Sequence, residues 1–387
     1  MRVLISGSYG TGNVGDEVIL EGVLRALSGH EVSVLSKNAT YTRTHFDVSV
    51  ISEAPPLSIL SVLKDLGKFR LRNIARRVRF IGAMLRTDVF LMGGGGLIAE
   101  LLPTVLTFHL SQLRLAKRLR KKVVLFAVGV GPLRTPGGIA LTKATLNSCV
   151  DFISVRDGHS KSLLEKIGVT RPIHLLPDPA VHYRIPVAAT RKRVIFNFYK
   201  TFVDERVFPG QKYRFEKLKS SLLEITKYLL EKHDYEVRFL TFGTLGEFEF
   251  ADELCALIND PRCTVSPYHE DFHVTARELG TAHFIIAMRL HACLIAMVNG
   301  VPSICIDQQF KTERVLDEIG LRELLLELPD GYHKQGNSDL EMADVITKLN
   351  YVHANHDAIR SKLLSYFDQQ RACYDVELSK LKSALHL

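Results

Sequence analysis

Residues 1–17, MRVLISGSYGTGNVGDE, decide the fold of this chain. The apolar run Val3–Ser6 leads straight into a glycine-rich turn, and Asp16 and Glu17 follow the last glycine, where a helix is expected to begin. A short β-branched run, a glycine-rich turn and a helix in this order are typical of the first strand of a parallel sheet. The segment Gly10–Gly15 therefore predicts a ligand-binding turn at the carboxyl end of that strand.

The same turn matches the dinucleotide-binding pattern of glycines, but its surroundings argue against a dinucleotide. The second predicted strand, Glu31–Ser36, is not followed by the acidic residue that binds a ribose hydroxyl. Asp16 and Glu17 would also place two carboxylates beside a pyrophosphate bound at the start of the helix, where like charges repel. We therefore predict a polyhydroxyl ligand at this turn; the alternative is that Asp16 only caps the helix.

Short β-branched runs alternate with longer helical patterns along the chain, and its 387 residues fit two domains. A basic connector, Val181–Arg193, precedes a second start at the strand Val194–Phe198. We expect an α/β chain with two Rossmann-like parallel-sheet domains that face a cleft, in residues 1–187 and 190–350. Residues 352–387 predict a C-terminal helix that packs back on the first domain.

Composition favours a cytoplasmic protein. The six cysteines have no paired spacing, and several lie in apolar runs, where cysteine behaves as a small hydrophobic residue. The amino terminus has the pattern of a strand and not of a signal peptide, and no run of about 20 residues is freely apolar. We predict a cytoplasmic location, extended by peripheral association with the inner face of the membrane.

The net charge of +8 is unevenly distributed, and one segment, Lys64–Arg86, contains the single acid Asp65 among many basic residues. Apolar residues are threaded through this segment at helical spacing. A solvated helix face and an amphipathic surface that meets anionic lipid both fit the pattern. Nucleic acid is not expected as a partner, because no zinc finger, helix-turn-helix or aromatic RNA-binding motif accompanies the charge. The basic residues are Lys64, Lys68, Arg70, Arg72, Arg76, Arg77, Arg79 and Arg86.

Glycines end two further predicted strands of the first domain. Gly93–Gly96 and Gly129–Pro132 each follow an apolar run. Such glycines let backbone amides approach a ligand closely, although a tight turn alone would explain one such site. Charged residues follow two later strands, and for these a buried ion pair and a turn are structural alternatives to ligand binding. These residues are Arg156, Asp157 and Asp178.

The strongest constellation lies in the second domain, after the predicted strand Phe284–Ala287. Arg289 and His291 stand at the start of the helix Leu290–Val298, where the helix dipole and the free amides attract anions. Lys311 follows the next strand. Two cations at adjacent strand ends suit a ligand with two anionic groups, whereas a lone arginine at a helix start is usually a surface residue.

One short motif is attributed to chance. The stretch His269-Glu270-Asp271-Phe272-His273 spells the HExxH zinc signature. That signature needs both histidines on one face of an established helix and a third ligand, whereas a proline two residues upstream indicates a loop. We predict no metal site and no cofactor.

In their order along the chain, these motifs resemble the polysaccharide pyruvyl transferase family. The resemblance implies a fold like that of the GT-B glycosyltransferases and the transfer of a pyruvyl group from phosphoenolpyruvate onto a sugar as a ketal. The implied acceptor is a cell-surface polysaccharide or its lipid-linked precursor. The motifs that carry the resemblance are Gly10–Glu17, Gly93–Gly96, Gly129–Pro132, Arg156-Asp157, Asp178-Pro179, Arg289–His291 and Lys311.

The resemblance also assigns roles to residues. Phosphoenolpyruvate carries a carboxylate and a phosphate, and the implied contacts are Arg289, Leu290 and Lys311. His291 is the implied acid that protonates the methylene carbon, and Asp16 is the implied base for the acceptor hydroxyls. Further substrate contacts are assigned to Gly12, Asn13, Glu17, Gly94, Gly95, Gly131, Arg156 and Asp178.

Two departures from the family pattern leave the acceptor open. The stretch Gln308-Gln309-Phe310 replaces one that contains tyrosine and aspartate, and Glu100 stands where an aspartate is common. Two other functions compete with pyruvyl transfer. One is a GT-B glycosyltransferase that uses a nucleotide sugar, for which Glu313 and Asp317 are the candidate ribose acids. The other is a non-catalytic scaffold for polysaccharide assembly.

Overall fold

The chain forms two compact units, each with one parallel sheet, so the predicted α/β class with two parallel-sheet domains is confirmed. The described part of the chain contains no helix with the length and apolar character needed to cross a bilayer. The computed structural model describes residues 1–56, 61, 65–68, 70–100, 103–186, 192–198, 212–242, 246–267, 269–307, 311–327 and 340–385. Unit 1 comprises Met1–Thr11, Asp16–Pro179 and Gln370–Leu387, and unit 2 comprises Gly12–Gly15 and Ala180–Gln369.

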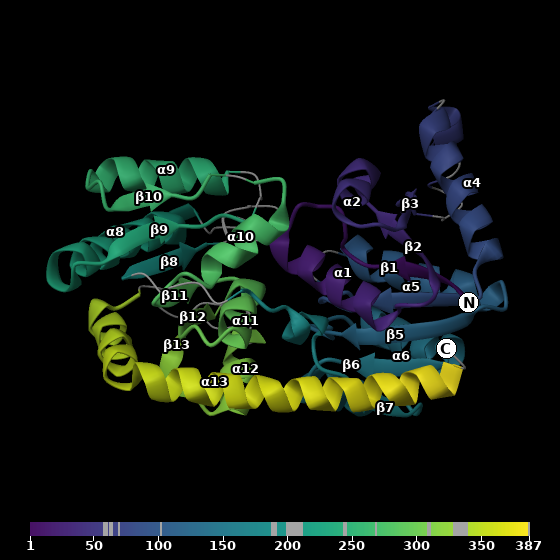
Figure 1. Cartoon of the computed structure of the whole chain (residues 1–387). Coiled ribbons are helices and arrows are strands. Elements are labelled where there is room, and N and C mark those ends of the chain that lie inside the picture. The colour runs from purple at the N-terminus through teal and green to yellow at the C-terminus, as the bar shows by residue number, and fades with distance from the viewer. Residues whose placement is uncertain are drawn as a thin grey trace. The chain divides into compact units, whose positions relative to one another are not determined.

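Unit 1 is built on a seven-stranded parallel sheet in the order β3-β2-β1-β4-β5-β6-β7 (Figure 1). The central strands β4 and β5 are buried along almost their whole length, which explains why their sequences are continuously apolar. The strands are β1 (Arg2–Ser6), β2 (Glu31–Ser36), β3 (Ser49–Ser52), β4 (Val89–Gly93), β5 (Lys122–Val128), β6 (Phe152–Val155) and β7 (Ile173–Leu175). The helices in this part of the chain are α1 (Val14–Ala26), α2 (Ala39–His45), α4 (Leu71–Arg86), α5 (Pro103–Arg118), α6 (Pro136–Cys149), α7 (Gly158–Lys166) and the 3-10 helix η1 (Pro179–His182).

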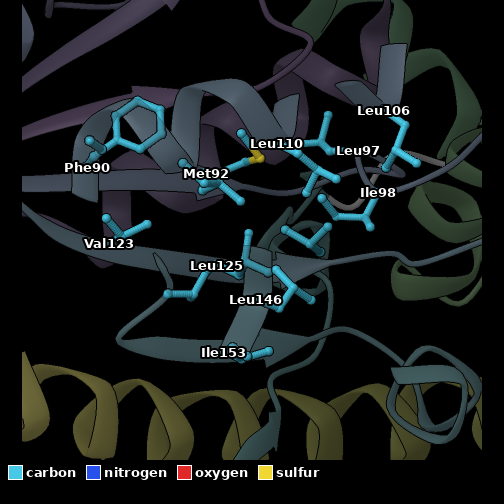
Figure 2. Packing of buried hydrophobic residues seen from close by; sticks show 14 of the residues in the cluster. Phe90, Met92, Leu97, Ile98, Leu106, Leu110, Val123, Leu125, Leu146 and Ile153 are labelled. Atoms are coloured by element: carbon cyan, nitrogen blue, oxygen red, sulfur yellow. The ribbon is translucent and has the colours of Figure 1, made fainter. Parts of the chain in front are cut away.

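A contiguous apolar core fixes the central strands of unit 1. Leu110 of α5 and Leu146 of α6 pack in one cluster with Met92 and Leu125 of the sheet (Figure 2). Burial of one such leucine side chain contributes about 1.5–3 kcal/mol to stability. The strands whose carboxyl ends carry the predicted site residues are therefore held rigidly.

Unit 2 contains a six-stranded parallel sheet in the order β10-β9-β8-β11-β12-β13. Its helix α11 is buried from Ala292 to Val298, which explains an almost wholly apolar sequence. The strands are β8 (Arg193–Asn197), β9 (Glu236–Phe239), β10 (Cys263–Val265), β11 (Phe284–Ala287), β12 (Ser303–Asp307) and β13 (Leu325–Glu327). The helices are α8 (Lys212–His233), α9 (Glu247–Ile258), α10 (Phe272–Leu279), α11 (Leu290–Val298), α12 (Lys311–Ile319), the 3-10 helix η3 (Arg322–Leu324) and α13 (Met342–Leu385).

The C-terminal helix α13 begins ahead of the predicted Val352 and bends at one residue. Asn355 has non-helical dihedral angles (φ −124°, ψ 16°), and its side-chain amide donates to the carbonyl of Tyr351 (2.9 Å). Residues up to Gln369 group with unit 2, and residues from Gln370 onward group with unit 1. One helix thus supplies side chains to both cores.

The predicted elements and the observed ones differ where elements are short. The edge strands β10 and β13 have three residues each, which is a weak signal for alternation, and were not predicted, whereas the equally short β7 was. The helical spacing around Lys64–Arg86 predicts one long helix over residues 58–85. The structure has helical residues at 61 and 65–67 and then α4, which begins at Leu71. Residues 58–60, 62–64 and 69 of that prediction lie outside the described residues.

Candidate functional site

The glycine-rich turn after β1 is held by a buried carboxylate. Glu17 is fully buried, and its Oε1 accepts hydrogen bonds from the backbone N–H groups of Gly10 (2.9 Å) and Thr11 (3.1 Å). A carboxylate that accepts two amides from one turn fixes the shape of that turn. The structure therefore gives Glu17 a structural role beneath the turn, in addition to the substrate contact predicted for it.

Residues Gly12–Gly15 belong by their contacts to unit 2, where the turn packs against His291. A Cβ atom on Gly15 would lie 2.5 Å from the Cβ of His291 and 2.8 Å from its Nδ1. Only glycine leaves room for the imidazole at this distance. The Oδ1 of Asn13 accepts a hydrogen bond from the backbone N–H of Gly15 (3.1 Å), which stabilises the same turn. Two segments that were selected separately in the sequence therefore meet in unit 2.

Asp16 lies in unit 1 among other carboxylates and a buried tyrosine. Its Oδ1 is 3.7 Å from the position that a Cβ on Gly95 would take, at the end of β4. The hydroxyl of Tyr9 donates to the backbone carbonyl that ends the same strand. Burial raises the pKa of Tyr9 well above its usual value, and the charges of Asp16, Glu17 and Asp178 raise it further. Tyr9 therefore stays protonated, and three predicted acids share one region of unit 1.

Arg156 and Asp178 form a buried ion pair between two strand ends of unit 1. The guanidinium Nη1 lies 2.9 Å from the carboxylate, and each side chain is 8% exposed. A Cβ on Gly129 would lie 3.0 Å from the guanidinium, so the glycine after β5 admits the arginine. The buried ion pair, which was the structural alternative to ligand binding for these two residues, is therefore present. The pair also lies beside the glycine-rich strand ends.

The two glycine-rich strand ends of unit 1 are hydrogen-bonded to each other. The N–H of Gly129 donates to the carbonyl of Gly95 (2.8 Å), and the N–H of Gly131 donates to the carbonyl of Ile98 (2.8 Å). Gly94 has a φ of +69°, and a Cβ there would lie 1.9 Å from a methyl group of Ile19 in α1. The predicted residues Gly94, Gly95 and Gly131 therefore come together at the carboxyl ends of β4 and β5.

In unit 2, Arg289 pairs with Glu247, a residue that the sequence analysis did not select. The guanidinium binds the carboxylate in the first turn of α9, and the two side chains are 10% and 2% exposed. Glu247 also accepts the backbone N–H of Phe242 (3.2 Å), whose ring centre lies 5.8 Å from the guanidinium carbon. Arg289 is thus held in one orientation at the carboxyl ends of β9 and β11. The sequence gives no local signal for Glu247, because β9 ends at Phe239 and Glu247 follows only after an intervening segment.

The other residues predicted for the anion site lie on two helix starts. Leu290 and His291 occupy the first turn of α11, next to Arg289, and both are partly exposed. Lys311 is the first residue of α12. Its side chain and residues 308–310 lie outside the described residues.

Glu100, the acid that replaces a common aspartate, braces a turn. It accepts hydrogen bonds from the backbone N–H (2.8 Å) and the hydroxyl (2.6 Å) of Thr135 and from the N–H of Arg134. Partial burial raises the pKa of Glu100, but these hydrogen bonds outweigh that effect and hold it below its usual value. Glu100 therefore stays ionised and holds the start of α6.

The zinc-like motif does not lie on one helix. The helix α10 begins at Phe272 with Asp271 as its cap, so His269 and Glu270 precede it. The Nδ1 of His273 lies 2.9 Å from the hydroxyl of Tyr183. Among the residues that the structure describes, no three histidine, cysteine or acidic side chains are grouped as a metal site would require.

Comparisons with known proteins identify a family for this chain. The family model for polysaccharide pyruvyl transferase matches residues 13–309. The chain is 19% identical over 418 residues to the amylovoran biosynthesis protein AmsJ of Erwinia amylovora, with 96% of each chain covered.

Solved structures share the fold at low sequence identity. A putative UDP-N-acetylglucosamine 2-epimerase from Listeria monocytogenes has a TM-score of 0.57 and 14% identity, with 94% of this chain and 90% of that chain covered. The E. coli heptosyltransferase WaaC with ADP has a TM-score of 0.50 and 16% identity, with 92% and 100% covered. At these identities the likeness shows the fold alone, and it confirms the GT-B-like prediction.

Proposed function

Because the chain belongs to the polysaccharide pyruvyl transferase family, we propose that it transfers a pyruvyl group from phosphoenolpyruvate to a sugar and forms a pyruvate ketal. The proposed acceptor is a sugar of a cell-surface polysaccharide or of its lipid-linked precursor. The family and the relative named as an amylovoran biosynthesis protein both support a transferase that modifies a polysaccharide.

The packing of His291 on Gly15 carries this proposal. In unit 2 the imidazole follows Arg289 by two residues and lies against the backbone of the glycine-rich turn. An imidazole can donate a proton near neutral pH, and an oriented guanidinium binds a carboxylate or a phosphate. Asp16 is the next residue after Gly15, so the two Cα atoms are about 3.8 Å apart. The proposed base, Asp16, therefore directly follows in the chain the glycine on which the proposed acid, His291, packs.

The proposed reaction uses His291 as the acid and Asp16 as the base. His291 protonates the methylene carbon of phosphoenolpyruvate, and positive charge develops on the carbon that bears the phosphate oxygen. A sugar hydroxyl adds to that carbon and gives its proton to Asp16. The bond from this carbon to the phosphate oxygen breaks, and a second hydroxyl closes the ketal as its proton passes to the departing phosphate. One phosphoenolpyruvate thus yields one ketal and one phosphate, without oxidation or reduction.

Donor binding is assigned to the start of α11. Phosphoenolpyruvate carries two anionic groups, and the N–H groups of a helix start attract such groups. Arg289 would bind one of them, and its buried pair with Glu247 sets the direction of the guanidinium. Lys311, at the start of α12, is proposed for the other anionic group.

Acceptor binding is assigned to unit 1. Asp16 lies beside Gly95, and the ion pair of Arg156 and Asp178 lies at the neighbouring strand ends. Carboxylates and a guanidinium in fixed positions suit the hydroxyl groups of a sugar, which donate and accept hydrogen bonds. The glycine-rich strand ends leave backbone amides close to such a ligand.

The rival glycosyltransferase function has less support. The acids that could bind a nucleotide ribose, Glu313 and Asp317, are both bound to Arg322, at 2.6 Å and 2.9 Å. These carboxylates are thus engaged in an ion-pair network at the surface. The likeness to the heptosyltransferase structure shows the fold and does not indicate the substrate.

A thermal-shift titration with phosphoenolpyruvate and with a UDP-sugar tests the proposal. Bound ligand stabilises a protein by RT ln(1 + [L]/Kd), about 2.7 kcal/mol at a hundredfold excess over Kd. We expect phosphoenolpyruvate to raise the melting temperature and the UDP-sugar to leave it unchanged. A shift with the UDP-sugar alone would identify a glycosyltransferase, and no shift with either ligand would favour the scaffold.

The variants for this titration must not leave Glu247 buried without its partner Arg289. Arg289→Ala alone would leave a buried carboxylate without its partner, which costs about 3–5 kcal/mol and confuses binding with stability. The combination Arg289→Met with Glu247→Gln avoids this cost, and Glu247→Gln alone keeps the guanidinium. Only the combination should lose the phosphoenolpyruvate shift.

Two further variants complete the test. Arg184→Met, at an exposed arginine of unit 2, is the matched control and should keep the shift. His291→Gln should also keep the shift but lose the release of phosphate from phosphoenolpyruvate in the presence of acceptor. If the shift survives the combined change at Arg289 and Glu247, the donor binds elsewhere.

A further inference from the structure

The helix α4 of unit 1 carries an apolar stripe that the fold leaves exposed. Leu71, Val78 and Leu85 are 71%, 64% and 55% exposed, and Ile81 is 37% exposed. With Ile74 between them, these residues recur at spacings of three and four and so form one line along the helix. Figure 1 shows α4 at the periphery of its unit. A contiguous exposed apolar line on a soluble domain indicates an interaction surface.

A different side of α4 accounts for its packing in unit 1. Phe80 and Met84 are buried, and Arg77 lies beside them with a side chain that is 6% exposed. Its guanidinium lies 2.7 Å from Asp65 and donates to the carbonyl of Pro56 (3.1 and 3.2 Å). Arg77, which the sequence analysis counted with the basic residues of this segment, is therefore a structural residue. It also neutralises the single acid of the segment.

A row of arginines flanks the apolar stripe. Arg72, Arg79 and Arg86 are exposed and recur every seven residues, so they share one side of the helix. The small residues Ala75 and Gly82 separate this row from the stripe. No acidic residue occurs between residues 66 and 86. Aliphatic side chains beside arginines that form no ion pair with the described residues match the boundary between acyl chains and anionic headgroups.

We propose that α4 docks unit 1 onto an anionic lipid bilayer. The stripe of Leu71, Ile74, Val78, Ile81 and Leu85 enters the headgroup boundary, and the arginine row pairs with lipid phosphates. None of these residues is assigned to pyruvyl transfer, so this inference stands or falls separately from the proposed function. If both hold, the bilayer is also where a lipid-linked acceptor would be found.

Charge complementarity favours a bilayer over a second copy of the chain. A symmetric contact between two α4 helices would place the same surface on both sides of the interface. It would bring arginine rows together with no acid within residues 66–86 to compensate. A nucleic acid would use the arginines but would leave the aliphatic stripe in water.

Flotation of the full-length protein with lipid vesicles tests this surface. We expect it to float with vesicles that contain phosphatidylglycerol and not with phosphatidylcholine alone. Arg72→Glu with Arg79→Glu should lower the partition coefficient by at least about twenty-five-fold, because each cation near such a surface contributes about a factor of five. Lys227→Glu with Lys232→Glu, at exposed lysines of α8, changes the net charge equally and should have little effect.

A second pair of variants tests the apolar stripe. Val78→Ser with Leu85→Ser should weaken flotation without lowering the melting temperature, because both side chains are exposed. Four results would overturn the proposal. Flotation could be equal for every variant, or the α8 control could lose as much flotation as the α4 variants. The protein could instead fail to float and form a dimer that Val78→Ser dissociates, or bind duplex nucleic acid in place of vesicles.

Discussion

Arg289 illustrates how the candidate site controls charge at the scale of single residues. Its pair with buried Glu247 orients the guanidinium but cancels much of its charge. The proposed donor, with its two anionic groups, would then draw additional attraction from the N–H groups at the start of α11. In the proposed reaction, a guanidinium of fixed orientation would hold the methylene carbon of the donor towards His291.

Gly15 gives a sharper test at the same scale. Gly15→Ala adds a Cβ that would lie 2.5 Å from the Cβ of His291, so either the turn or the helix α11 must shift. A displacement of about 1 Å at a catalytic group can cost a hundredfold in rate, and we expect kcat to fall by at least about tenfold. Steady-state release of phosphate from phosphoenolpyruvate measures this loss.

Gly158→Ala is the matched control for Gly15→Ala. Gly158 also lies in the first turn of a helix, and a Cβ there would meet nothing within 4 Å. This control should keep wild-type activity and should not lower the melting temperature. Wild-type kcat in Gly15→Ala would show that the contact with His291 has no part in the reaction.

The sequence yields candidate residues for the site, but not the residues that they contact. Arg289, His291 and Asp16 follow strands, and a parallel sheet gathers strand ends at one edge. Glu247 and Tyr9 were missed because their importance arises from contacts that spacing does not encode. Glu247 is 42 positions away from Arg289, and only the pairing of β8 with β9 and β11 brings the start of α9 close to the start of α11.

At the scale of elements, a group of histidines joins α13 to the amino-terminal edge of the second sheet. The rings of His283 and His356 are stacked with centroids 4.1 Å apart, and those of His233 and His353 are 4.6 Å apart. Burial lowers the pKa of His283 to about 4, helped by His356 and His353 and opposed by Asp357. Burial also lowers the pKa of His353, helped by the neighbouring histidines.

We predict that unit 2 loses stability as the pH falls from about 6.5 to about 4. The unfolded chain protonates its histidines near a pKa of about 6.5, whereas folded His283 stays neutral down to about 4. The unfolded state thus binds more protons within this window, so the free energy of unfolding decreases as the pH falls and is fully recovered above it. Urea unfolding at a pH above the window and at a pH within it measures the effect.

A matched pair of variants isolates the contribution of the histidine group. His283→Phe keeps an aromatic ring beside His356 but cannot titrate, so its stability should depend less on pH than that of the wild type. Leu257→Phe, at an exposed position of α9 in unit 2, changes no titratable group and should keep the wild-type pH dependence. The same pH dependence in all three proteins would place the acid sensitivity elsewhere.

At the scale of the whole molecule, the sequence predicted two parallel sheets because the strand and helix signals restart after the basic connector. It did not predict how α13 is divided. The helix continues from unit 2 into unit 1, and its bend at Asn355 comes from a local backbone irregularity that helical periodicity does not encode. In unit 1 its last turns supply Tyr374, Leu381 and Leu385, all buried.

The last turns of α13 should therefore stabilise unit 1 selectively. Tyr374 is 2% exposed, and its ring packs edge-on against Phe126 of β5 with centroids 6.3 Å apart. Tyr374→Ala removes a buried aromatic side chain and should lower the free energy of unfolding by about 3–5 kcal/mol. Hydrogen exchange should quicken at the amides of β4 and β5 and stay unchanged in β8 and β11. Cys373→Ala, at the exposed neighbouring position, should change neither. Unchanged exchange in β5 of Tyr374→Ala would mean that unit 1 holds its sheet without the end of α13.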